Sequence, residues 1–118
     1  MFARELLPVL GPGGAVAVTG SINQTATAAG TTLATGTAIT TVHTYCTTAT
    51  EGQGFTLPAS MNPADEANVC NATSVGIYVY PPSGGKINGA TAGVPVRLAP
   101  NSAATFVCAN GTDWLANW

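Results

Sequence analysis

Apolar and polar positions alternate in short runs along the last third of the chain, from residue 72 to residue 118. The runs SVGIYVY, PVRLA and SAATFVC are separated by PPSGG, KING and PNS, where proline removes an amide donor and glycine permits unusual backbone angles. Asn110-Gly111 lies between two apolar runs, which is a strong signal for a tight hairpin with positive φ at both central residues. The pattern predicts a β-meander over residues 54–118.

The upstream pattern predicts further short strands, at residues 15–19, 38–46, 54–58 and 67–72. Residues 21–36 are rich in Thr, Ala and Gly, and they can either pack flat against a partner or form a weakly ordered loop. Turn residues recur too often for helices. The sequence therefore predicts an all-β fold, a small antiparallel β-sandwich or jelly-roll-like barrel over residues 15–118, preceded by a short extended N-terminal arm at residues 1–14.

The predicted arm is apolar but is broken by Pro8, and residues 11–14 (GPGG) separate it from the β-domain. A helical segment this short is marginal in water, so an ordered arm needs a surface to dock on. We expect the arm to contact a partner through its apolar side chains, which are Phe2, Leu6, Leu7, Val9 and Leu10.

Four aromatic residues in the last third are candidates for core or interface positions. Val75, Ile77 and Val79 alternate with Tyr78 and Tyr80, so one face of this strand is expected in the core, while the tyrosines cover the second face or meet a partner. We predict that Trp114, in the hairpin, is buried and that Trp118 belongs to an interface.

Charge is the most unusual feature of the composition. Only 7% of the 118 residues are charged and 46% are hydrophobic, with a net charge of −2. Because solubility usually depends on interspersed charges, a neutral surface is easier to understand if other subunits cover much of it. Three basic residues cannot neutralise many phosphates, so we expect no nucleic-acid partner. We likewise expect no membrane partner, since no apolar run approaches the length of a membrane span, and synthesis in a cytoplasm, since residues 1–10 lack a secretory pattern.

The inventory of reactive side chains predicts no catalytic, cofactor-binding or metal site. His43 is the single histidine, and Cys46 lies three positions further along a strand, on the opposite face. Together with Cys70 and Cys108 they match a Cys₃His zinc set in type but not in spacing, so we expect three free cysteines, with Cys108 buried.

Residues 54–118 resemble a small module of tailed-bacteriophage virion proteins, found in capsid decoration proteins and in fibre-like proteins. The resemblance lies in the order of its pieces: a TLP strand, an Asn-containing strand, a strand ending in YPPSGG, the KING turn, a V-x-L strand, SAATFVC and a turn before Trp114. It implies a structural virion protein without catalysis.

The compact domain and short arm favour a decoration (cement) protein, which binds the outside of an assembled capsid and stabilises it. The implied partners are the major capsid protein and further copies of the chain, as a homotrimer or alternatively a dimer, and the implied location is the capsid surface of the virion. The alternative is a tail or head fibre module that binds a receptor. A domain without a virion role is disfavoured by the scarcity of charge.

Overall fold

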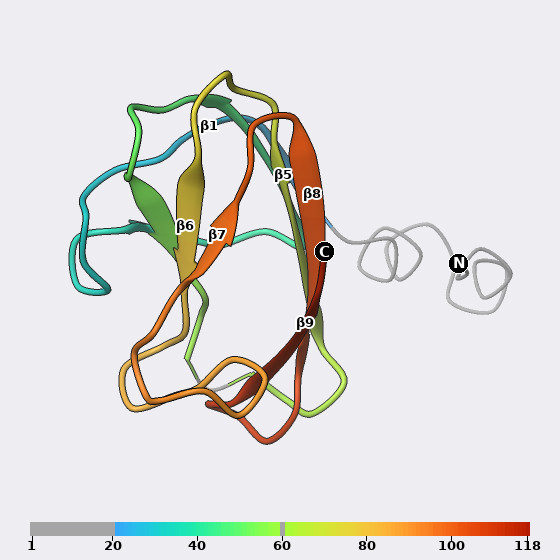
Figure 1. The fold of residues 1–118 in the computed structure, drawn as a ribbon. Coiled ribbons are helices and arrows are strands. Elements are labelled where there is room, and N and C mark those ends of the chain that lie inside the picture. Colours follow the sequence, from blue (N-terminus) through green and yellow to red (C-terminus); the bar gives the residue numbers. More distant parts are fainter. Residues whose placement is uncertain (1–20, 60) are drawn as a thin grey trace, which may run out of the picture.

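The computed structural model describes residues 21–59 and 61–118, and in this part of the chain it has two facing sheets (Figure 1). Sheet A has the strand order β1-β3-β5-β8-β9 and sheet B the order β2-β4-β6-β7. The strands of sheet A are β1 (Ile22–Thr27), β3 (His43–Thr48), β5 (Glu66–Asn71), β8 (Ser102–Cys108) and β9 (Trp114–Asn117). Those of sheet B are β2 (Thr37–Ala38), β4 (Gly54–Thr56), β6 (Ile77–Tyr80) and β7 (Val96–Leu98).

From β1 to β6 the chain alternates between the two sheets, so that successive strands of one sheet run parallel. In sheet A, β1 pairs with β3 and β3 with β5; in sheet B, β2 pairs with β4 and β4 with β6. Parallel neighbours need a long crossover connection, which is usually a helix. Here each crossover passes through a strand of the opposite sheet, and the first part of the domain is a stack of coils.

The last part of the chain adds antiparallel strands to this stack. β6 and β7 form a hairpin in sheet B, while β8 pairs antiparallel with both β5 and β9 in sheet A. The predicted antiparallel sandwich or jelly-roll-like barrel is therefore wrong, because both sheets mix parallel and antiparallel pairs. The continuous β-meander predicted for residues 54–118 is wrong as well, because the strands of this segment divide between two sheets and only the two hairpins remain.

The remaining strand predictions have mixed outcomes. The segment 21–36, left open between a flat packing surface and a loop, contains strand β1. The strand predicted over residues 38–46 is interrupted, and its second half forms β3. The predicted arm and the strand predicted at residues 15–19 lie outside the described residues.

The core lies between the two sheets. It holds the inward side chains of both sheets, and its largest fully buried members include Trp114, Phe55, Phe106, Leu57, Ile77 and Leu98. Trp114 is 1% exposed, which confirms its predicted place in the core. Its indole N–H has no acceptor among the described residues.

The β8–β9 hairpin is present, but its turn differs from the predicted one. Gly111 has a φ of 100°, whereas Asn110 keeps a negative φ. The Ala109 N–H donates to the Asp113 carbonyl at 2.8 Å, and the Asn110 side-chain oxygen accepts from the N–H groups of Thr112 and Asp113. The connection is therefore longer than two residues and is held by an Asn side chain.

The free edge of β9 is covered by the KING segment of the β6–β7 connection. The Trp114 N–H donates to the Lys86 carbonyl at 2.8 Å, and the Asn88 N–H donates to the Trp114 carbonyl at 2.9 Å. The Asn88 side chain also bonds both backbone groups of Ala116. Among the described strands, β1 is thus the uncovered edge of sheet A. No helix in residues 21–59 or 61–118 is long and apolar enough to cross a membrane.

Candidate interaction surface

The face of sheet A that points away from the core carries a continuous set of uncovered side chains. Alternation along the strands separates them from the core: on β3, Thr44 and Cys46 are buried, whereas His43 and Tyr45 are exposed. Strand pairing joins the outward positions into rows across the sheet. We call this set the outer face of sheet A; its rows are Ile22–His43–Asn68–Thr105–Asn117, Tyr45–Cys70–Ala103 and Glu66–Val107–Leu115.

Large apolar side chains gather at this face. Five large hydrophobic residues are exposed in the described part of the chain, and three of them lie on the outer face of sheet A: Ile22 at 54%, Tyr45 at 43% and Leu115 at 56%. Trp118, at 58%, directly follows the last residue of β9 at the border of the same sheet (Figure 1). Only Val94 lies elsewhere, in the β6–β7 connection. The others share one face of the sheet but lie on both sides of its middle strands, whose small and polar side chains separate them.

The centre of the outer face is hollowed. A groove of about 290 Å³ runs over the middle strands, where small side chains leave room between Ile22, Tyr45 and Asn117. Cys70, Ala103 and Thr105 are among the residues that line it. The groove is open and has no converging set of charged groups, so its shape suits apolar side chains of a partner better than a small polar ligand.

The outer face of sheet A is almost free of charge. Its ionisable side chains are His43, Tyr45, Cys70 and Glu66. Both described basic residues belong to sheet B or its connections, Arg97 on β7 and Lys86 after β6. A neutral face can approach another protein surface without losing the hydration of many charged groups, which is a costly step.

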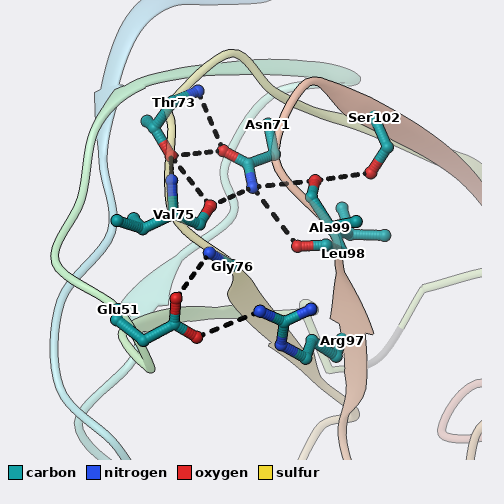
Figure 2. Close-up of polar contacts among 9 residues, drawn as sticks. All are labelled: Glu51, Asn71, Thr73, Val75, Gly76, Arg97, Leu98, Ala99 and Ser102. Atoms are coloured by element: carbon teal, nitrogen blue, oxygen red, sulfur yellow. Dashed lines mark hydrogen bonds and ion pairs between the residues drawn. The ribbon is translucent and has the colours of Figure 1, made fainter.

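The opposite side of the molecule carries an ion pair. On sheet B, Tyr78 pairs with Arg97, whose guanidinium lies 3.2 Å from the Glu51 carboxylate (Figure 2). Glu51 also accepts the Gly76 N–H at 3.0 Å, and this bond, followed by Arg97, lowers the pKa of the Glu51 carboxyl group. Since both charged side chains are largely exposed, the ion pair contributes little to stability.

A buried polar cluster fastens the end of β5 to two neighbouring turns (Figure 2). Asn71 is fully buried, and its side-chain nitrogen donates to the carbonyls of Val75 at 2.8 Å, Ala99 at 3.1 Å and Leu98 at 3.2 Å. Its side-chain oxygen accepts from the N–H and the hydroxyl of Thr73, at 3.0 and 2.7 Å. Asn71 therefore links sheet A to the start of β6 and the end of β7, and its role is structural.

The histidine and the cysteines lie apart from one another. His43 and Cys70 belong to the outer face of sheet A, whereas Cys46 and Cys108 are buried on its inner side, so the sheet separates the four possible zinc ligands. In the described residues, no group of three or more His, Cys, Asp or Glu side chains is placed to hold a metal ion. All three cysteines are free, and burial raises the pKa of the Cys46 thiol.

The two tyrosines expected at an interface occupy different environments. Tyr78 is half-buried, whereas Tyr80 is 8% exposed and its hydroxyl donates to the Thr31 carbonyl at 2.7 Å. Burial, and then the nearby Tyr78, raises the pKa of the Tyr80 phenol. Tyr80 therefore holds the connection between β1 and β2 rather than facing solvent.

The other predicted interface residues divide into two groups. Trp118 is exposed next to the outer face of sheet A, and the predicted contacts of the arm, Phe2, Leu6, Leu7, Val9 and Leu10, lie outside the described residues. Sequence reasoning missed Ile22, Tyr45 and Leu115 as interface candidates. The available signal was the alternation of β3, which sets Tyr45 beside His43, although this pattern alone does not say which face is the core.

Comparisons with protein-family models, with curated proteins and with solved structures found no match to this chain.

Proposed function

We propose that the protein is a structural component of a bacteriophage virion, a decoration protein that binds the outside of an assembled capsid and stabilises it. The observation that carries this proposal is the outer face of sheet A, where exposed apolar side chains surround a neutral groove. A surface with few charges suits a protein that remains covered by its neighbours. A second support is the order of strand and turn motifs in residues 54–118, which resembles that of tailed-bacteriophage virion modules.

Capsid stabilisation of this kind needs binding and no chemistry. A protein that binds the assembled lattice but not its dissociated subunits shifts the equilibrium toward the lattice by mass action, and at a free concentration one hundred times Kd the gain is about 2.7 kcal/mol per site. The major capsid protein is the proposed partner, on the outer surface of the virion. Self-association, as a trimer or a dimer, lets one decoration unit bridge neighbouring capsid subunits.

The direct test mixes the purified protein with undecorated, tailless phage shells. We expect saturable co-sedimentation and a higher temperature of shell disruption. A matched pair of variants connects the result to the structure: Tyr45→Lys places a charge on the outer face of sheet A, and Val94→Lys places the same charge on an exposed apolar residue elsewhere. Only Tyr45→Lys should weaken binding.

The same assay separates the decoration role from the fibre role. Adhesion of the protein to host cells without binding to shells would contradict the proposal and favour a receptor-binding module. If the protein binds neither shells nor host cells, its resemblance to virion modules is limited to local sequence motifs and says nothing of function.

A further inference from the structure

We propose that residues 15–19 pair with the free edge of β1 as an antiparallel strand, joined to β1 by a two-residue turn at Gly20-Ser21. The segment directly precedes the described residues. The inference goes beyond the proposed function, because it names the occupant and the register of a sheet edge and involves no capsid. Four observations carry it: the direction of the backbone of β1, the length of the open edge, the turn sequence and the alternation of side chains.

The backbone at the start of β1 presents hydrogen-bonding groups to the free edge. The Ser21 carbonyl accepts the His43 N–H of β3 at 2.8 Å, and in a trans peptide the carbonyl and the N–H of the next residue point in opposite directions. The Ile22 N–H therefore points away from β3. Asn23 continues the pairing with β3, so the N–H of Gln24 points the same way as that of Ile22. No described strand lies on that side of β1.

Only the first half of β1 is open to a further strand. The register is irregular between Asn23 and Ala26, where the Thr25 N–H donates to the Asn23 side-chain oxygen at 3.2 Å. A bulge is one of the ways in which proteins block an exposed sheet edge, and it ends the regular edge here. Residues 22–24 carry no such block. A strand that returns through a two-residue turn at residues 20 and 21 places residues 17–19 directly against them.

The sequence between the two strands matches a tight hairpin turn. Gly20-Ser21 lies between the alternating run AVAVT and β1, and a Gly-Ser pair in this setting is a hairpin signal. A type II′ turn has Gly at its first central position because φ is positive there. The turn closes with a hydrogen bond from the Ile22 N–H to the Thr19 carbonyl, on the side to which this N–H points. Ser21 is also held at β3, because the Val42 N–H donates to its hydroxyl oxygen at 3.3 Å.

The register sorts the side chains of the segment onto two faces. The opposed pairs are Thr19–Ile22, Val18–Asn23 and Ala17–Gln24. Asn23 lies beside Thr44, which is buried on the inner side of sheet A, so Val18 and Val16 also lie on the inner side. A slip of one residue would turn both valines outward. Because the segment runs antiparallel to β1, the predicted arm at residues 1–14 leaves the domain beside the far end of β1.

Amide hydrogen exchange of the full chain, followed by NMR, tests the pairing. We expect slow exchange at residues 17, 19, 22 and 24, whose N–H groups face the opposite strand, and fast exchange at Val18, whose N–H faces away. Gly20→Val strains the turn and should accelerate exchange at Ile22 and Gln24 about tenfold. Gly14→Val, outside the turn, should have no effect. Unchanged exchange in β8 shows that each variant is folded.

A pair of cysteine variants tests the register. Val18 and Asn23 face each other without mutual hydrogen bonds, and the Cα atoms of such pairs lie about 4.5 Å apart, within reach of a disulfide. Val18→Cys/Asn23→Cys should therefore be oxidised by glutathione disulfide several-fold faster than Val18→Cys/Gln24→Cys, whose side chains lie on opposite faces. Mass spectrometry of a digest distinguishes this bond from any bond to the three native cysteines.

Each other outcome overturns the inference. Fast exchange at Ile22 and Gln24 in the wild type means that the edge is open in the free chain, and slow exchange that depends on protein concentration means that a second copy supplies the strand. Slow exchange that Gly20→Val leaves unchanged means another segment, and equal oxidation of the two cysteine pairs means another register. Because no shells are present, these results are independent of the decoration role, which the shell assay reports.

Discussion

Asn71 is the residue with the densest set of hydrogen bonds to separate parts of the domain. It is buried at the end of β5, and its amide reaches two successive carbonyls at the end of β7 as well as the turn before β6. A carboxamide is the side chain of this size that can donate two hydrogens and accept two bonds at once. The position also belongs to an Asn-x-Thr triplet whose side-chain polar atoms all form hydrogen bonds inside the fold.

Replacement of Asn71 by Ala should lower the free energy of unfolding by about 2–3 kcal/mol, because buried carbonyls lose their donor. Asn71→Asp should be at least as destabilising at neutral pH, since a carboxylate oxygen would then face those carbonyls. Urea denaturation measures both. Asn23→Ala is the matched control: Asn23 is exposed and accepts only the Thr25 N–H, so its loss should cost within about 0.5 kcal/mol. Equal effects at the two positions would contradict the role given to Asn71.

At the scale of elements, the sequence predicted strands well and their pairing poorly. Alternation located β5, β6 and β8 within a few residues, because inward and outward positions differ in polarity. Parallel pairing had no comparable signal. A stacked coil is detectable in sequence when its repeat is constant, but here the paired positions Ile22–His43, His43–Asn68, Thr37–Phe55 and Gly54–Tyr78 span unequal lengths of chain. The turn motifs that predicted a meander specify only the local hairpins.

Close stacking of the coils requires a residue without a Cβ atom at the start of β4. Gly54 lies between β6 and residue 29, whose backbone it bonds in both directions, and a Cβ at this position would lie 2.5 Å from the Tyr78 carbonyl oxygen. Gly54→Ala should lower the free energy of unfolding by about 1–3 kcal/mol, because backbone atoms must move apart. Amide exchange of Ala29 and Gly54 should also accelerate more than exchange in β8.

Gly52→Ala separates this steric effect from a backbone effect. Gly52 has a φ of 89° with open space around its Cβ position, so alanine there should cost about 1–2 kcal/mol without selective opening of β4. If Gly54→Ala left the exchange of Ala29 and Gly54 unchanged relative to β8, the close approach of β4 and β6 would not be the constraint proposed here.

At the scale of the whole molecule, the composition favours a surface that other subunits partly cover, but it does not say which part. Scarcity of charge is a property of the whole chain, whereas an interface is defined by which face of a sheet points outward. Which side chains share the outward face depends on how the strands that carry Ile22, Tyr45 and Leu115 pair with their neighbours. Part of this pairing is parallel, and the sequence has no clear signal for parallel pairing. Trp118, predicted at an interface, is exposed, and its place in an interface stays a prediction.

The same scarcity of charge predicts an unusually flat dependence of stability on pH. Stability changes with pH only where a group binds protons differently in the folded and unfolded states, and the chain has five Asp and Glu residues and three Lys and Arg residues. On the acidic side, the lowered pKa of Glu51 means that the folded state holds its charged form, so stability is lost as the pH falls below the ordinary value of 4.5.

On the alkaline side the sign is reversed. Burial raises the pKa of Cys46 above 9.0 and that of Tyr80 above 10.0, so the folded state holds both groups neutral, and stability is lost as the pH rises above these ordinary values. Urea denaturation from pH 3 to pH 11 should therefore give a plateau with two declining limbs. Tyr80→Phe should flatten the alkaline limb while losing the hydrogen bond to Thr31 at every pH, whereas Glu51→Gln should change the acidic limb only slightly, because Glu51 is largely exposed. A steep decline near neutral pH would show that groups other than these three control the stability of the fold.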